Sequence, residues 1–211
     1  MKTGNAAGAA PGILLVTLDA AEGDEQELHD WYDFEHIPER AGVAGFKTLQ
    51  RYVCLEGWPR FLALYDLESL RVLESEAYQA IVGENYTPWS KRVIGKVRGW
   101  IRSEAELVGA GAAQTGAAGA PLRLLLVSFK DVQEYEEQGL AKKLDAYANK
   151  KFEILQARLF RVANTTERRL YALIELSVPR SLSDFDWEVL TPDSGTIDIA
   201  NIYTRYWRSQ N

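Results

Sequence analysis

The chain has 211 residues and a net charge of −6, and 46% of its residues are hydrophobic. This length suits one large domain or two small ones, and each half can bury a core of its own. No segment concentrates lysine and arginine as a nucleic-acid-binding surface would, and no segment is apolar for long enough to span a membrane. We therefore expect neither nucleic acid nor a membrane as a partner.

The chain's beginning and its cysteine content favour a cytoplasmic location. Cys54 is the only cysteine, so no internal disulfide can form, and a reducing compartment is the default expectation. Residues 1–11 are rich in alanine and glycine but lack the apolar core of a signal peptide. We expect these residues to form a flexible tail.

A run of small residues at 108–120 has no periodicity and predicts a linker. Similar segments occur in the same order on its two sides. Ile13–Leu18 resembles Leu124–Phe129, and Arg60–Leu67 resembles Arg169–Leu176. Such a repeat indicates an internal duplication. The predicted organisation is a tail at 1–11, a domain at 12–107, a linker at 108–120 and a second domain at 121–211.

Each copy shows the order βαββαβ. Apolar, β-branched runs predict strands, and helical spacing with an expected N-cap at Asp24 predicts the first helix, which Pro38 should distort or end. In the first copy the expected elements are a strand at 12–20, a helix at 24–43, strands at 46–55 and 61–67, a helix at 69–84 and a strand at 97–107. The second copy repeats them at 122–130, 132–150, 156–163, 168–178, 183–190 and 198–208.

This order predicts an α+β fold. A βαββαβ unit forms a four-stranded antiparallel sheet with both helices on one face, and the bare face must be covered. The second copy is the simplest cover. We therefore expect two tandem ferredoxin-like βαββαβ units packed sheet to sheet as a pseudo-dimeric α/β barrel. Such a chain is a monomeric pseudo-dimer, or a homodimer if edge strands pair between chains.

Both histidines lie in the first predicted helix, and the chemistry of the chain is expected there. At helical spacing, Tyr32, Glu35 and His36 share one side, and Trp31 lies at its border. An ordinary amphipathic helix would place leucine or isoleucine at these positions. Buried ionisable groups are costly unless they are hydrogen-bonded or face a wet cavity. Two alternatives follow: an acid–base site, or groups that brace the helix against the sheet.

A wider pattern carries a resemblance to a known family. The string Trp31-Tyr32-x-x-Glu35-His36-Ile37-Pro38, followed by Gly45-Phe46, Arg51-Tyr52 and the strand at 61–65, resembles the EthD-like family of dimeric α/β-barrel proteins. The resemblance covers about residues 12–107 and implies that fold. It also relates the chain to muconolactone isomerases, cofactor-free quinone-forming monooxygenases, polyketide cyclases, haem-binding chlorite dismutases and dye peroxidases. The second half matches only in its strand pattern, and no histidine follows His36, so we expect one site and a scaffolding second half.

The first hypothesis for function is a cofactor-independent lyase or isomerase acting on a small aromatic or lactone-like metabolite. His36 would move a proton, Glu35 would orient and charge-tune it, and Tyr32 would polarise the substrate oxygen. The second hypothesis is a non-catalytic small-molecule-binding or accessory protein. The third is a haem-dependent oxidoreductase with His36 as axial ligand.

Five further residues are candidates for substrate binding: Trp31, His29, Arg51, Trp58 and Tyr65. A solvated surface histidine is the commoner alternative for His29, and exposed side chains are the commoner alternative for Arg40 and Arg51. We expect no metal site, because Glu35 and His36 are adjacent on a helix and point in different directions. No cofactor is expected under the first hypothesis.

Overall fold

The computed structural model describes residues 9–109 and 114–208. Eight antiparallel strands close into one barrel in the order β1-β3-β2-β8-β5-β7-β6-β4. These strands are β1 Gly12–Asp19, β2 Phe46–Glu56, β3 Phe61–Leu67, β4 Arg98–Val108, β5 Arg123–Lys130, β6 Ile154–Val162, β7 Arg169–Leu176 and β8 Thr196–Arg205. The expected α+β class and the eight strands are confirmed.

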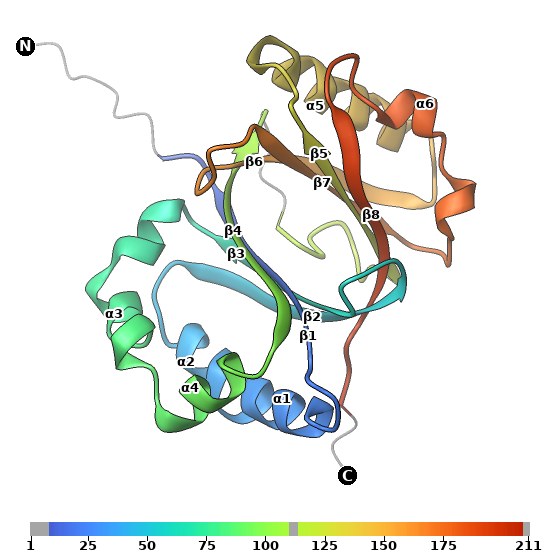
Figure 1. Cartoon of the computed structure of the whole chain (residues 1–211). Helices are drawn as coiled ribbons and strands as arrows, with labels where there is room; N and C mark the ends of the chain where they lie inside the picture. The colour runs from blue at the N-terminus through green and yellow to red at the C-terminus, as the bar shows by residue number, and fades with distance from the viewer. Residues whose placement is uncertain (1–8, 110–113, 209–211) are drawn as a thin grey trace, which may run out of the picture.

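The helices lie outside the barrel, those of the first half on one side and those of the second half on the other (Figure 1). The first half contains α1 Glu25–Trp31, the π-helical turn η1 Tyr32–His36, α2 Ile37–Ala41, η2 Leu70–Glu74, α3 Glu76–Gln79, η3 Gly83–Asn85 and α4 Pro88–Ile94. The second half contains α5 Glu134–Asn149, η4 Leu182–Asp184 and α6 Trp187–Leu190. Within the described residues, no helix is long and apolar enough to cross a membrane.

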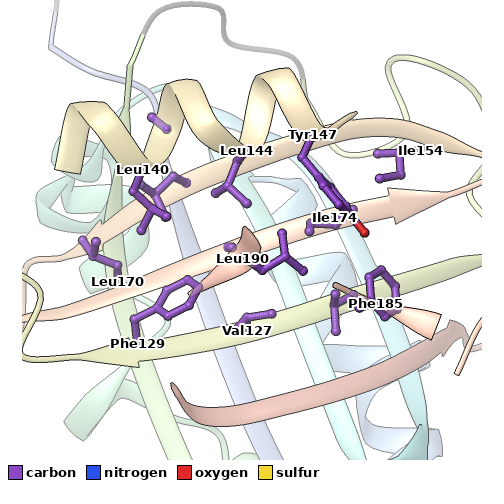
Figure 2. Close-up of a cluster of buried hydrophobic side chains, with 14 of the residues drawn as sticks. Val127, Phe129, Leu140, Leu144, Tyr147, Ile154, Leu170, Ile174, Phe185 and Leu190 are labelled. Atoms are coloured by element: carbon purple, nitrogen blue, oxygen red, sulfur yellow. The ribbon is translucent and has the colours of Figure 1, made fainter. Parts of the chain in front are cut away.

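Alternation along the strands divides the core into three clusters. On β1, Leu14 and Val16 pack toward the first-half helices, whereas Ile13 and Leu15 point into the barrel, because successive strand residues face opposite sides. The third cluster fills the space between the second-half strands and α5. Figure 2 shows it to be tightly occupied by apolar side chains, among them Phe129, Leu144 and Tyr147.

A turn at 114–119 closes one end of the barrel. The Thr115 N–H donates to Asp66 (2.8 Å) and the Gly116 N–H donates to Glu175 (2.9 Å). Arg158 lies between these two carboxylates, 2.5 Å from Asp66 and 3.5 Å from Glu175. Asp66 and Glu175 occupy equivalent positions in the repeated strand segments, so the turn is fastened to both halves at once.

The helical segments that follow β3 differ from the sequence analysis in two ways. The single helix expected at 69–84 is wrong: short helical turns replace it, because Ser75 caps a new helix and Gly83 has a φ of +61°. A helix that the sequence analysis did not predict, α4, follows at Pro88–Ile94, where the Thr87 side chain accepts from the Ser90 N–H.

Asp24 makes no side-chain cap, because its carboxylate pairs with Lys96 (3.2 Å). The pairs β2–β8 and β4–β6 close the barrel, so the described strands leave no free edge for a second chain. Residues 1–8 of the expected tail and 110–113 of the expected linker lie outside the described residues.

Candidate functional site

A small cavity lies between the first-half strands and the helices that cover them. Its volume is about 30 Å³, which is comparable to the space of one water molecule. The strands contribute the apolar residues of β1 together with Tyr65 and Arg102, and α1, η1 and α2 contribute Trp31, Tyr32, His36 and Arg40. The lining residues are Leu14, Val16, Leu18, Trp31, Tyr32, His36, Arg40, Tyr65, Tyr78, Tyr86, Ile94, Val97, Trp100 and Arg102.

The π-helical turn η1 sets the direction of the key side chains. The Ile37 N–H donates to the Tyr32 carbonyl oxygen, five residues earlier, and Pro38 follows with no N–H of its own to donate. The expected distortion near Pro38 is therefore present, as a widened turn. Within this turn the rings of Tyr32 and His36 lie edge to face with centroids 5.1 Å apart, and both line the cavity.

His36 is held as a neutral imidazole. Its side chain is buried, and its ring packs against Trp31 with centroids 4.0 Å apart. Burial lowers the pKa of His36 well below its ordinary value, and the positive charges of Arg40 and Arg51 lower it further. Among the described residues, Nδ1 of His36 has no hydrogen-bond partner. Nδ1 of the imidazole is therefore able to accept or donate a hydrogen bond at the cavity.

Two more cavity residues carry polar atoms without a partner. Arg40 is only 2% exposed, and its guanidinium donates to the His36 carbonyl oxygen (3.2 Å), but its Nε has no partner among the described residues. The same is true of the Tyr65 hydroxyl. Unpaired buried polar atoms are costly, so three of them around one cavity indicate a place for an oxygen-bearing ligand. Burial raises the pKa of Tyr32 to about 12, so this phenol stays protonated.

Glu35 lies next to His36 in sequence but contacts other groups. One of its carboxylate oxygens accepts from the Thr87 hydroxyl (2.7 Å), the Ser90 hydroxyl (2.8 Å) and the Trp31 indole N–H (3.2 Å). These bonds join η1 to α4. None of these hydrogen bonds joins Glu35 to His36. Glu35 therefore holds together the helices that cover the cavity.

Three predicted binding residues lie outside the cavity. His29 is 8% exposed, so the alternative of a solvated surface histidine is wrong: its ring stacks on Tyr206 (4.4 Å). Arg51 is also buried, not exposed, and its guanidinium lies between the rings of Tyr32 (4.3 Å) and Tyr206 (4.2 Å). Trp58 is exposed and donates its indole N–H to Asp19 at the far end of β1.

The structure thus brings together Trp31, Tyr32, His36 and Tyr65, and adds residues that the sequence analysis had not assigned to the site. Arg40 could have been found, because it follows His36 by four residues and shares its helix face. The remaining additions come from distant segments, and no local pattern marks them: Tyr78, Tyr86, Trp100 and Arg102. In the described part of the chain, no group of three histidine, cysteine or carboxylate side chains could hold a metal ion.

Comparison with solved structures defines the class of fold. No protein-family model matches the sequence, and no curated protein is significantly similar to it. Solved structures do match over nearly the whole chain, and they belong to the dimeric α/β-barrel superfamily. The chain therefore shares the fold of dimeric α/β-barrel proteins.

Three of these structures show the range of the likeness. An anthrone oxidase-like protein is 10% identical with a TM-score of 0.57, covering 94% of this chain and 92% of its own. A protein described as a chlorite dismutase is 10% identical with a TM-score of 0.59, covering 94% and 95%. A haem-binding protein from Thermus thermophilus is 12% identical with a TM-score of 0.51, covering 93% and 91%.

These descriptions correct the first functional hypothesis. The structural neighbours are described as oxidase-like, dismutase and haem-binding proteins, so the prediction of a cofactor-independent lyase or isomerase is wrong. The third hypothesis of the sequence analysis, a haem-dependent oxidoreductase, is the one that these descriptions resemble. Since the identities are near 10%, the activity of this chain has to be argued from its own cavity.

Proposed function

We propose that the chain is an oxidoreductase that oxidises a small anthrone-type molecule, at a methylene group activated by a ring carbonyl, with dioxygen at the cavity around His36. The observation that carries this proposal is the buried, neutral imidazole of His36, whose unpaired Nδ1 shares the cavity with the unpaired Tyr65 hydroxyl and Arg40 Nε. The oxidase-like description of a structural neighbour supports the class of reaction.

The first step in this proposal is removal of a proton from the substrate. His36 accepts the proton at Nδ1, which its neutral state allows. A low pKa makes the imidazole a weak base, but the positive charge of Arg40 that lowers the pKa of His36 also lowers that of a substrate beside it. Arg40 and the Tyr65 hydroxyl then donate hydrogen bonds to the substrate oxyanion, which stabilises it in a site that excludes water.

Oxidation follows on the electron-rich anion. Overall, a methylene group and dioxygen become a carbonyl group and water: one oxygen atom enters the substrate, and the other leaves with the two hydrogens. His36 returns its proton to the departing oxygen, so the enzyme ends the cycle unchanged. The cavity has a volume of about 30 Å³, so a substrate ring has to displace the half-exposed side chains of Trp100 and Tyr86.

Oxygen uptake tests this proposal. We expect anthrone to cause oxygen consumption, and His36→Ala to lower kcat/KM by about 10²- to 10⁴-fold, the usual contribution of a general base. Tyr65→Phe should lower it less. Tyr147→Phe is the matched control for Tyr65→Phe, because Tyr147 is a buried tyrosine of the apolar cluster in Figure 2, in the other half of the chain. No uptake, together with no change in the His36 imidazole NMR signal on ligand addition, would contradict the proposal.

Haem is the cofactor that the neighbours' descriptions suggest, and the residues here do not fit it. In favour, His36 Nδ1 is an unpaired imidazole nitrogen. Against it, the His36 ring is packed against Trp31 and Tyr32, with centroids 4.0 and 5.1 Å apart, and the cavity of about 30 Å³ would have to open much further for a porphyrin than for a three-ring substrate. The second-half counterpart is filled by apolar side chains (Figure 2). When haem is added, we expect the wild type and His36→Ala to give the same absorption spectrum. A band that appears with the wild type and is lost in His36→Ala would show that His36 binds haem.

We further propose that the chain is a tandem of ferredoxin-like units, at 12–107 and 121–211, joined by the linker at 108–120 and related to the EthD-like proteins. The support is the repeated segment pattern and the matching order of strands in the two halves. In this proposal the chain works as a monomeric pseudo-dimer in the cytoplasm, with one site in the first unit and the second unit as scaffold.

A further inference from the structure

The interior of the barrel contains a second, larger cavity on the side of the strands opposite the His36 site. Its volume is about 410 Å³, within the range of small-molecule binding pockets. The two cavities are separated by β1: Leu14, Val16 and Leu18 face the His36 cavity, whereas Leu15 and Thr17 face this one. Neither the function proposed above nor the sequence analysis uses it.

The cavity lies toward one end of the barrel. It reaches the ends of β1 and β7 marked by Thr17 and Arg169. At the opposite ends of these strands, the turn at 114–119 is bonded to Asp66 and Glu175. The cavity and this turn therefore lie at opposite ends of the barrel.

The lining of the cavity is partly apolar and partly polar. Barrel-core side chains form the apolar part, Leu15, Leu126 and Val162. Hydroxyl groups lie beside them, including the Ser103–Tyr171 pair whose oxygens are 3.0 Å apart. A molecule that fits this lining has an apolar body and a polar head.

The mouth carries two cations beside one lining carboxylate. The cations are Lys130 and Arg169, and the carboxylate is Asp198. Arg102 also lines the cavity, but its guanidinium donates to the Tyr78 hydroxyl on the helix side of the sheet. Asp198 is shared: it lies 2.6 Å from both Lys130 and Arg169. Glu104 and Glu167 pair with Arg102 and Arg169 from outside the lining. The Lys130 ammonium group has three N–H donors, and Asp198 is the one acceptor within ion-pair distance among the described residues.

We propose that this cavity binds a small organic anion with an apolar body. Its carboxylate accepts hydrogen bonds from Lys130 and Arg169 at the mouth, and its apolar part lies against Leu15, Leu126 and Val162. The proposal does not rest on the chemistry assigned to His36, because the two cavities lie on opposite sides of β1.

Methyl NMR with benzoate as the probe tests this site, because leucine and valine methyl groups report separately on each cavity. We expect benzoate to shift the methyl signals of Leu15, Leu126 and Val162, and neutral benzamide, which has the same shape, to shift them far less. Lys130→Gln should weaken benzoate binding about tenfold, as the loss of one charged hydrogen bond does. Lys47→Gln is the matched control, since Lys47 lies at the opposite end of the barrel.

Three results would overturn the proposal. The first is the absence of any benzoate-induced shift at Leu15, Leu126 and Val162. The second is an equal response to benzamide, because the site would then not recognise charge. The third is equal weakening by Lys130→Gln and Lys47→Gln, which would reflect the overall charge of the protein. Shifts confined to Leu14, Val16 and Leu18 would assign benzoate to the His36 cavity alone and would likewise exclude the barrel site.

Discussion

At the residue scale, the site depends on polar atoms that the fold buries without pairing. His36, Arg40 and Tyr65 each present such an atom at one cavity, although most buried polar groups in proteins are hydrogen-bonded. By contrast, Glu35 is fully engaged with Thr87, Ser90 and Trp31. The sequence analysis had treated Glu35 and His36 as one unit. In the structure one of them holds the helices together, and the other remains available for chemistry.

The buried state of His36 predicts how stability depends on pH. The pKa of His36 is lower in the folded chain than the ordinary value of about 6.5 in the unfolded chain. Below pH 6.5 the unfolded chain therefore binds more protons, so the free energy of unfolding falls as the pH is lowered toward the folded-state pKa. One such group contributes a slope of up to about 1.4 kcal/mol per pH unit, and its contribution is fully present above pH 6.5. Urea unfolding at several pH values measures this slope.

His36→Leu provides the comparison for that measurement. The pKa of His29 is also lowered, by burial and by Arg51, so the wild-type slope contains both histidines. We expect His36→Leu to have a smaller slope of unfolding free energy against pH between pH 6.5 and 5. The remaining slope would include the contribution of His29. Identical slopes in the wild type and in His36→Leu would mean that His36 is not buried in its neutral form.

At the element scale, regular strands were predictable and irregular helices were not. Four strands, β1, β3, β5 and β7, are short apolar runs buried along almost their whole length. Such runs are visible in the sequence, so the strand bounds agree with the sequence analysis to within a few residues. The segment from Leu70 to Ile94 has no single helical period, and its caps at Ser75 and Thr87 divide it into short pieces. The burial of Arg40 and Arg51 was missed for a different reason: it depends on strands and aromatic rings distant in the sequence.

Arg51 on β2 connects three elements, and its loss should destabilise the protein. Its guanidinium donates to Asp33 (2.9 Å), lies 2.7 Å from Nδ1 of His29, and is enclosed by two tyrosine rings. Arg51→Ala removes the contacts with Asp33 and His29 and leaves a gap between the two tyrosine rings, so we expect a loss of about 3 kcal/mol in the free energy of unfolding. Arg51→Lys should lose less stability, because lysine keeps the positive charge. Some loss should remain, because lysine lacks the planar guanidinium group.

The control for Arg51 is an arginine of the same half. Arg60 is 57% exposed at its side chain and pairs with Glu25 at 3.1 Å. Arg60→Ala should change the free energy of unfolding by at most about 1 kcal/mol, as is usual for exposed ion pairs. If urea unfolding shows similar losses for Arg51→Ala and Arg60→Ala, Arg51 does not hold α1 to the barrel.

At the scale of the whole molecule, the two halves share one barrel and one closing contact. Asp66 and Glu175 come from equivalent strands, β3 and β7, and both approach Arg158 on β6. Burial alone would raise the pKa of Asp66, but Arg158 and the bonds from Thr115 and Thr48 hold it below its ordinary value. For Glu175, burial raises the pKa and Arg158 opposes the rise. One guanidinium thus compensates two buried carboxyl groups, one from each half.

This arrangement predicts that Arg158 couples the halves during unfolding. Arg158→Ala leaves Asp66 and Glu175 facing each other without a cation, so we expect a loss of about 3–5 kcal/mol, larger at neutral pH than at acid pH where carboxylates are protonated. Arg161→Ala on the same strand is the matched control. Arg161 is 49% exposed, and Arg168 also lies 3.8 Å from its buried partner Glu137, so the loss of Arg161 should cost only about 1 kcal/mol. Urea unfolding followed by tryptophan fluorescence and by circular dichroism measures both variants. A loss for Arg158→Ala no greater than that for Arg161→Ala would show that the turn and the strand pairing close the barrel without this contact.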